Sequence, residues 1–161
     1  MADLFCGSGR VAAACRSSGF RAKCCGIAKG AAYDLTGRGV RDKLVRDIRD
    51  GEILAAMLAP PCSSFVPGGN RAVKLRSSER PWGIDDGSLT DDQMARVKSG
   101  NDLLRAAFKV IKALDRHAVP WIFEHPSGSF AFMTSEMREI LSRPSAHTRT
   151  CDQCQGGHPL A

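Results

Sequence analysis

Two short segments constrain the fold of this chain more than any other feature of its sequence. Residues 3–9 have the sequence DLFCGSG, and residues 58–65 have the sequence LAPPCSSF. The first is typical of a buried strand that runs into a glycine turn and opens a helix. The second is typical of a strand that ends in a rigid double proline and presents Cys62 on a loop. A nucleotide-type pocket next to a displayed thiol indicates an enzyme that uses a cofactor and a nucleophile.

Strands and helices are expected to alternate along the chain. The expected strands span residues 2–6, 20–27, 43–48, 56–59 and 118–123, and the expected helices span residues 10–17, 89–116 and 130–141, with a brief helical turn over residues 51–56. This order favours an α/β protein with a Rossmann-like parallel sheet and helices on both faces. Because ligands bind at the carboxyl ends of strands in such sheets, Gly7, Cys62 and Glu124 should lie at one edge.

Length and composition favour one globular domain. The chain has 161 residues, of which 43% are hydrophobic and 25% are charged, and this is enough for a buried core. We expect residues 1–143 to form the core and residues 144–161 to form a polar tail that begins a further C-terminal portion. Lys and Arg number 23 against 17 Asp and Glu, and the resulting formal charge of +6 favours anionic partners such as nucleic acid.

No segment of the sequence has the pattern of a membrane span or of a secretory leader. The sequence therefore predicts an intracellular protein without a membrane partner, and it does not distinguish the nucleus from the cytoplasm. In that setting the seven cysteines are expected to be thiols rather than disulfides. Their odd number and the adjacent pair Cys24-Cys25 agree with this expectation.

Three further features carry candidate chemistry. Pro60 and Pro61 restrict the backbone before Cys62, which a nearby helix terminus or basic group would activate as a thiolate. Glu124 follows an apolar strand, where partial desolvation would raise its proton affinity and suit it to acid catalysis. Asp47 follows an expected strand and could place a carboxylate beside an adenine amino group. An ordinary surface acid is the equal alternative for Asp47.

With these residues in view, the sequence resembles the DNA cytosine-5 methyltransferases, which use S-adenosylmethionine. DLFCGSG is similar to the first, cofactor-binding motif of that family, and Pro60-Pro61-Cys62 is similar to its nucleophile loop. Glu124-His125-Pro126 resembles its Glu-Asn-Val segment, or the Glu-Asn-Pro form of phage-like relatives. Asp47-Ile48 resembles its adenine-contacting pair, and Arg149 resembles part of its arginine-rich strand. The resemblance runs in order from residue 3 to about residue 130.

The resemblance implies an S-adenosylmethionine-dependent methyltransferase fold, incomplete at its C-terminus, and methyl transfer to carbon 5 of cytosine in DNA. It implies a covalent thiolate at Cys62 and a glutamate at Glu124 that binds the pyrimidine, with Arg149 as a third catalytic residue. The implied cofactor-binding residues are Asp3, Phe5, Gly7, Ser8, Gly9, Ile27, Asp47, Ile48 and Pro60. Phosphates near the thiol are expected to contact a basic cluster formed by Arg71, Lys74, Arg76 and Arg80.

The sequence departs from that family in three ways. Ala28-Lys29 follows the second expected strand, where the family has an acid for the cofactor ribose, and His125 stands where Asn is usual. The sequence also ends before a target-recognition domain and before the last helix of the cofactor pocket. Two alternatives therefore stay open, namely the same core acting on cytosine in RNA and a catalytically silent module that binds nucleic acid or cofactor.

A zinc-binding protein is a third alternative. Cys151, Cys154 and His158 have the residue types and partly the spacing of zinc ligands, and His147 would have to be the fourth. Because that spacing is unusual, no metal is expected.

Overall fold

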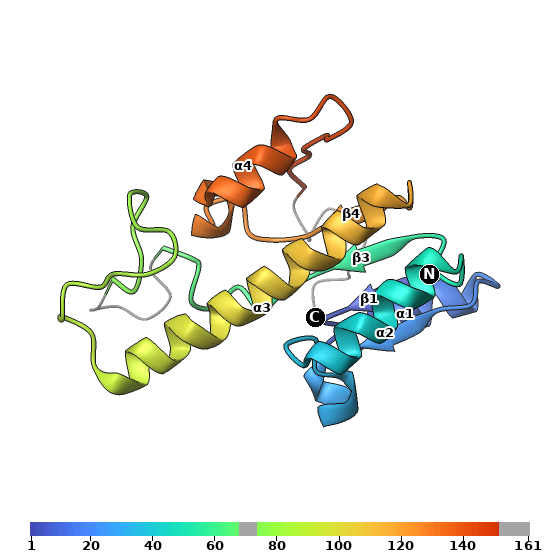
Figure 1. Ribbon diagram of the computed structural model, residues 1–161, viewed down its shortest axis with the longest axis horizontal. Helices are drawn as coiled ribbons and strands as arrows, with labels where there is room; N and C mark the ends of the chain where they lie inside the picture. Colours follow the sequence, from blue (N-terminus) through green and yellow to red (C-terminus); the bar gives the residue numbers. More distant parts are fainter. Residues whose placement is uncertain (68–73, 152–161) are drawn as a thin grey trace, which may run out of the picture.

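The computed structural model describes residues 1–67 and 74–151, and within them it contains one sheet of four parallel strands. The strands lie in the spatial order β2-β1-β3-β4 (Figure 1). Their bounds are Ala2–Leu4 for β1, Lys23–Cys25 for β2, Ala56–Leu58 for β3 and Trp121–Phe123 for β4. The register pairs the first residues of all four strands with one another. It therefore brings the carboxyl ends of all four strands to the same edge of the sheet.

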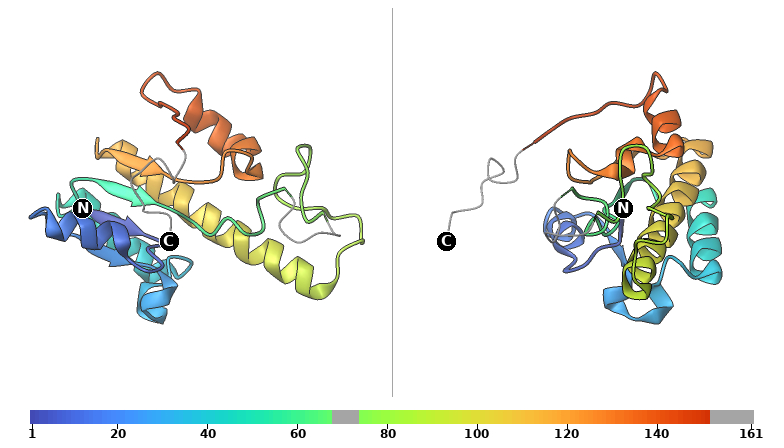
Figure 2. Two further views of the ribbon diagram at one scale, coloured as in Figure 1. Left: turned by 180° about the vertical axis from the view of Figure 1, so that it is seen from behind. Right: turned by 90° about the vertical axis from the view of Figure 1, so that its left-hand side faces the viewer.

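Helices cover both faces of this sheet. They are α1 (Arg10–Ser17), α2 (Arg38–Arg49), α3 (Asp91–Arg116) and α4 (Ser135–Leu141), with 3₁₀ segments η1 (Ile27–Lys29), η2 (Ala31–Tyr33) and η3 (Phe130–Met133). In Figure 1, α2 and α3 lie in front of the sheet and α1 lies behind it, and the reversed view in Figure 2 has α1 in front. The expected α/β class, with a parallel sheet compatible with a Rossmann-like fold, is confirmed.

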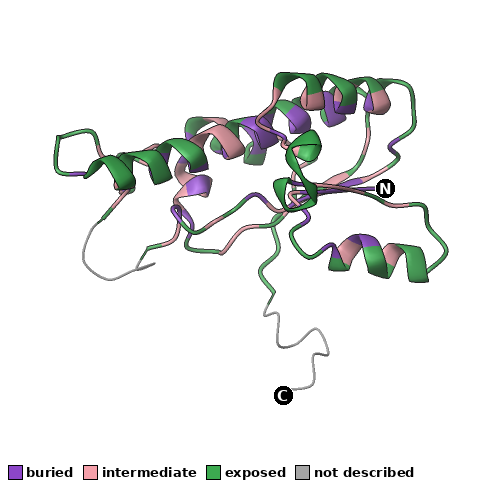
Figure 3. Ribbon diagram, turned by 90° about the horizontal axis from the view of Figure 1, so that it is seen from below, coloured by how far each residue is buried: buried purple, intermediate pink, exposed green. Residues whose placement is uncertain are grey.

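The hydrophobic core lies mainly where the long helix α3 packs with the strands. Figure 3 shows the buried stripe along this helix. Leu104, Ile111 and Leu114 on α3 are at most 1% exposed, and Leu4 on β1 and Leu58 on β3 are fully buried in the same cluster. Each such side chain stabilises the fold by about 1.5–3 kcal/mol relative to full exposure. The strand ends that carry the candidate site are therefore anchored in the best-packed part of the molecule.

The start of α3 is determined by a local capping motif. The Thr90 hydroxyl accepts a hydrogen bond from the Gln93 amide at 3.4 Å, and the Gln93 side chain accepts one from the Thr90 amide at 2.8 Å. Such a capping box satisfies two amides that the helix itself cannot. The helix expected over residues 89–116 is thereby confirmed to within two residues. Although α3 has 26 residues, neither it nor any other described helix is long and apolar enough to cross a membrane.

The strand expected over residues 43–48 is wrong, because these residues belong to α2. Val40, Leu44 and Ile48 recur every four residues, so a helix turns them all to one face, where Leu44 and Ile48 are buried. A run of six residues is too short to distinguish this period from that of a strand. Residues 51–55 form a turn and bends rather than the expected helical turn, and the helix expected over 130–141 divides into η3 and α4.

Candidate active site

Backbone hydrogen bonds continue past the strand ends and hold the chemistry-bearing segments next to one another. The Ala59 amide donates to the Leu4 carbonyl at 3.3 Å, and the Glu124 amide donates to the Leu58 carbonyl at 2.9 Å. The glycine turn after β1, the proline loop after β3 and the residues after β4 therefore share the carboxyl edge of the sheet. The expected convergence of these three segments is confirmed, and it is the basis of the site.

The turn after β1 has a backbone that only a few residue types adopt easily. Phe5, Gly7 and Gly9 have φ values of 61°, 44° and 73°. Glycine adopts such values without the steric cost that a Cβ brings. The Gly9 amide donates to the Cys6 carbonyl at 2.5 Å, which closes the turn directly before α1. A Cβ on Gly7 would meet no atom within 4 Å, so the backbone here borders open space, and Ser8 is exposed.

The segment after β2 forms a second wall beside this turn. A Cβ on Gly26 would lie 2.9 Å from the Cys6 amide nitrogen, so only glycine lets the two backbones approach this closely. Ile27 follows directly and is 60% exposed. The Lys29 ammonium would lie 3.9 Å from a Cβ on Gly9. Sequence reasoning noted this lysine only as a departure from a family pattern, whereas the structure makes it a cation at the glycine turn.

Asp3 is a buried carboxyl group that supports the turn after β1. It is 3% exposed, and its Oδ2 accepts a hydrogen bond from the Ala12 amide in α1 at 3.0 Å. Burial raises the pKa of this carboxyl group, although the hydrogen bond and Arg16 act in the opposite direction. Asp3 therefore fixes α1 to β1 and shapes the turn between them, and its carboxylate is not free to face a ligand.

A disulfide joins Cys6 in the glycine turn to Cys24 in β2. The parallel pairing of β1 with β2 brings the two Cα atoms to 5.8 Å, within the range that a disulfide spans. The expectation that all the cysteines are thiols is therefore wrong for this pair. Four other described cysteines are free, namely Cys15, Cys25, Cys62 and Cys151.

The loop after β3 presents Cys62 on a tight turn. Pro60 is buried, Pro61 is exposed and Cys62 is half-buried. The Cys62 carbonyl accepts a hydrogen bond from the Phe65 amide at 2.8 Å, which closes the turn. Phe65 is fully buried, and its carbonyl accepts from the Phe130 amide at 2.8 Å. The buried Phe65 thus anchors the loop in the core, while the Cys62 thiol is not part of a disulfide.

Arg76 stabilises the same loop from beneath, which sequence reasoning missed. It is 2% exposed and donates from Nε to the Ser64 carbonyl at 2.8 Å and from Nη2 to the Ser64 hydroxyl at 3.1 Å. Its other hydrogen bonds reach the carbonyls of Pro81 and Val97 and the side chain of Asn101. The Arg76 guanidinium also lies 3.7 Å from the centre of the Phe65 ring. Burial lowers the pKa of Arg76 to about 10, so it remains charged at neutral pH.

The expected cluster of phosphate-binding cations near the thiol is therefore wrong at Arg76, which is buried under the loop. Arg80 is exposed and pairs with Asp85 at 3.0 Å. Lys74 is exposed, and Arg71 lies outside the described residues. Nothing in the sequence near Arg76 distinguishes it from its basic neighbours, because its burial depends on Asn101 and Val97 in a distant helix.

Gly100 lets α3 approach the nucleophile loop. A Cβ at this position would overlap the Ser64 hydroxyl and would lie 3.1 Å from Arg76 Nη2 and 3.2 Å from the Phe65 ring. A glycine inside a helix costs stability relative to alanine, so this residue needs a packing reason. The reason here is the close contact between α3 and the loop that carries Cys62.

Glu124 and His125 follow β4 in opposite environments. Glu124 is exposed, so the partial desolvation expected for it is absent from this structure. The His125 ring is enclosed by Phe65, Phe123 and Phe132, with ring centres 5.8, 5.6 and 6.2 Å away. Both ring nitrogens are buried and have no hydrogen-bond partner among the described residues. Burial lowers the pKa of His125 to about 4, and the ring is therefore neutral at physiological pH.

Two residues expected at the site, Asp47 and Ile48, are not brought to it by the fold. Asp47 lies near the end of α2 and binds Lys23, the first residue of β2, at 3.2 Å, which places it at the amino edge of the sheet. Its hydrogen bond from Lys43 holds the pKa of Asp47 below its usual value. Ile48 is buried in the core. Arg149 is exposed in the irregular segment after α4. The strand that would have presented Asp47 and Ile48 is a helix.

The described part of the chain holds no group of three or more His, Cys, Asp or Glu side chains that could bind a metal ion. Cys151 and His147 are exposed. Cys154 and His158, the other ligands of the zinc alternative, lie outside the described residues.

Comparison of the chain with protein-family models, with curated proteins and with solved structures found no match. The residues and their arrangement are therefore the evidence for what this chain does.

Proposed function

We propose that this chain transfers the methyl group of S-adenosylmethionine to carbon 5 of cytosine in DNA, with Cys62 as the covalent nucleophile. One observation carries the proposal. The glycine turn, the loop of Cys62 and Glu124 come from three different strands and meet at the carboxyl edge of one parallel sheet. Ligands bind at this edge in α/β folds. The order and identity of these segments also match the motifs on which the family resemblance rests.

The residues of the glycine turn fit the proposed cofactor. Gly7 borders open space, and the exposed Ser8 and Ile27 flank the same turn. Gly7, Ser8 and Gly9 would hold the polar part of the cofactor through backbone and hydroxyl groups, and Ile27 would contact its adenine. When bound, the cofactor supplies an electrophilic methyl group. Lys29 would face the cofactor carboxylate, because its ammonium group lies at the turn.

The proposed chemistry assigns one step to each of two side chains. Carbon 5 of cytosine is a weak nucleophile until the Cys62 thiolate adds to carbon 6 and converts the ring to an enamine. Glu124 would stabilise this addition by binding ring nitrogen 3 and the amino group. After methyl transfer, a solvent water molecule takes up the proton of carbon 5, and the electron pair of that bond restores the ring double bond and expels the Cys62 sulfur. In a duplex the cytosine must first leave the base stack. Exposed Glu124 is accessible to such a base.

The experiment is a trapping assay with DNA that contains 5-fluorocytosine and with labelled S-adenosylmethionine. Fluorine at carbon 5 prevents the proton loss that releases the enzyme, so a covalent adduct should accumulate. Cys62→Ser should abolish the adduct, and Cys15→Ser is the matched control because Cys15 is also free and half-buried. An adduct that persists in Cys62→Ser, or wild-type protein that neither binds cofactor nor forms an adduct, would contradict the proposal. The same assay with RNA decides between the two nucleic acids.

A second candidate is a catalytically silent module that binds nucleic acid. It is favoured by the position of Asp47 at the amino edge of the sheet and by Lys29 in the segment where the family carries its ribose acid. Calorimetry with S-adenosylmethionine distinguishes the two functions. If the wild type releases heat on binding the cofactor and Gly7→Val does not, the enzyme is supported. If the wild type gives no heat with the cofactor but binds DNA, the silent module is supported.

A further inference from the structure

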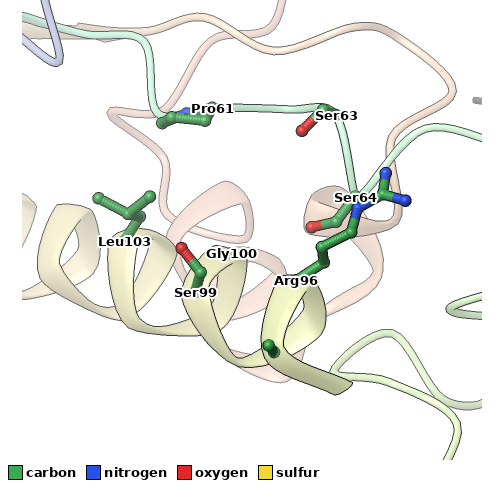
Figure 4. Close-up of a pocket in the computed structure, with 8 residues that line it drawn as sticks. Pro61, Ser63, Ser64, Arg96, Ser99, Gly100 and Leu103 are labelled. Atoms are coloured by element: carbon green, nitrogen blue, oxygen red, sulfur yellow. The ribbon is translucent and has the colours of Figure 1, made fainter. Parts of the chain in front are cut away.

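A pocket of about 320 Å³ separates the nucleophile loop from the N-terminal half of α3. Figure 4 shows Pro61, Ser63 and Ser64 on the loop side and Arg96, Ser99 and Leu103 on the helix side. The hydroxyl groups of Ser63 and Ser99 point into the space between the two walls, and the Arg96 side chain extends toward the loop beside Ser64 (Figure 4). Two of the lining residues, Pro61 and Ser63, are the sequence neighbours of Cys62, which is itself not among the lining residues.

The polar groups that line this pocket are suited to an oxyanion. They comprise one guanidinium and three hydroxyls, and among the described residues no carboxylate lines the pocket. The Ser64 oxygen already accepts a hydrogen bond from Arg76, so the Ser64 hydrogen is available to donate elsewhere. Guanidinium and hydroxyl groups that line one pocket are the kinds of donor that bind the acceptor oxygens of a phosphate group.

Arg96 is available for such a ligand. None of the ion pairs among residues 1–67 and 74–151 involves Arg96. The nearest cation along the helix, Lys98, is paired with Asp102 at 2.8 Å. Arg76, which the sequence had suggested for phosphate contact, is buried and fully bonded beneath the loop. Arg96, in contrast, is exposed.

We propose that this pocket binds a phosphodiester group of the nucleic acid strand, with Arg96 as the charged contact and the hydroxyls of Ser63, Ser64 and Ser99 as further donors. The proposal rests on the proposed function, since it specifies how the strand that carries the target base is held. A phosphate in this pocket would fix the strand next to Cys62. Arg76 and Gly100 would support the pocket by holding Ser64 against α3.

The test uses a fluorescein-labelled duplex of adenine and thymine only, without cofactor, and follows its binding to the full chain by anisotropy at several salt concentrations. Arg96→Ala should weaken binding about tenfold, as expected for loss of a charged hydrogen bond. It should also reduce the slope of log affinity against log salt by about 0.9, the value for one phosphate contact. Ser99→Asp should weaken binding further because it adds a carboxylate to the pocket.

Lys109→Ala is the matched control, since Lys109 is an exposed cation on the same helix outside the pocket. Equal affinity and slope for Arg96→Ala and Lys109→Ala would overturn the proposal. A second result would also overturn the proposal. If Arg96→Ala abolishes binding of inorganic phosphate but leaves the affinity for DNA unchanged, the pocket binds a small phosphate ligand instead. Because the duplex contains no cytosine, failure of methyl transfer does not affect this result. Arg96 and Lys109 are both exposed, so the melting temperature of Arg96→Ala and of Lys109→Ala should equal that of the wild type.

Discussion

Arg76 binds the Ser64 carbonyl at 2.8 Å from inside the protein, two residues after the cysteine that the loop presents. Its other hydrogen bonds reach two further segments, namely the Pro81 carbonyl and, in α3, the Val97 carbonyl and the Asn101 side chain. A buried charge bound only by neutral acceptors is costly to disturb, because each freed carbonyl would be buried without a partner. The conformation of the loop that carries Cys62 is therefore tied to the packing of the whole domain.

Replacement of this arginine should unfold the protein more easily. Arg76→Met keeps much of the apolar stem and removes every hydrogen bond, and we expect a loss of about 3 kcal/mol or more in the free energy of unfolding. Urea denaturation measures this loss. Arg80→Ala is the control, because its exposed ion pair should contribute less than about 1 kcal/mol. A wild-type denaturation midpoint for Arg76→Met would disprove a structural role for this residue.

Gly100→Ala should destabilise the protein, whereas the same change at Gly39 should stabilise it. Both glycines lie inside helices, where alanine is favoured by up to about 1 kcal/mol. A Cβ on Gly39 meets nothing within 4 Å, but one on Gly100 overlaps the Ser64 hydroxyl. Because of this overpacking, we expect Gly100→Ala to lower the free energy of unfolding by about 1–3 kcal/mol. Thermal melting of both variants measures the difference, and stabilisation by both would contradict the close packing of α3 against the loop.

Stability should fall in mild acid because of His125. Its pKa is about 4 in the folded protein against 6.5 without burial, so the unfolded chain takes up the proton first as the pH falls. The contribution of neutral His125 to the free energy of unfolding is complete above pH 6.5. It is lost progressively as the pH falls toward 4, by about 2–3 kcal/mol in total. His125→Phe keeps an aromatic ring in the same position and cannot titrate. Urea denaturation of both proteins at several pH values should show a smaller acid-induced loss in the variant, and parallel curves would contradict this assignment.

Reduction of the Cys6–Cys24 disulfide should lower the melting temperature. The bond joins residues 18 positions apart, and closing a loop of such length stabilises a protein by about 3 kcal/mol. Melting of the wild type with and without dithiothreitol measures the effect. Cys24→Ser should melt at a lower temperature and should not respond to the reductant. Cys15→Ser serves as the control, because Cys15 is free and its loss should leave the response intact.

The candidate site could be predicted from sequence only where the chemistry lies within one local segment. DLFCGSG and the double proline before Cys62 each specify a turn through local backbone restrictions, and the positions of the flanking strands followed from them. Asp47 could not be placed correctly, because its position depended on whether a six-residue run was strand or helix. That choice was decided by burial of Leu44 and Ile48 against the rest of the core.

By itself, the sequence determined the alternation of strands and helices outside residues 43–48, the start of α3 at its capping box and the three segments at the carboxyl edge. These features arise from short-range periodicity and capping, which neighbouring residues control. Only the tertiary structure decided that Arg76 lies beneath the loop, that Arg96 faces a pocket, that Cys6 meets Cys24 and that Asp47 lies at the opposite edge. Each of these depends on contacts between residues far apart in the chain, and packing of the whole domain brings such residues together.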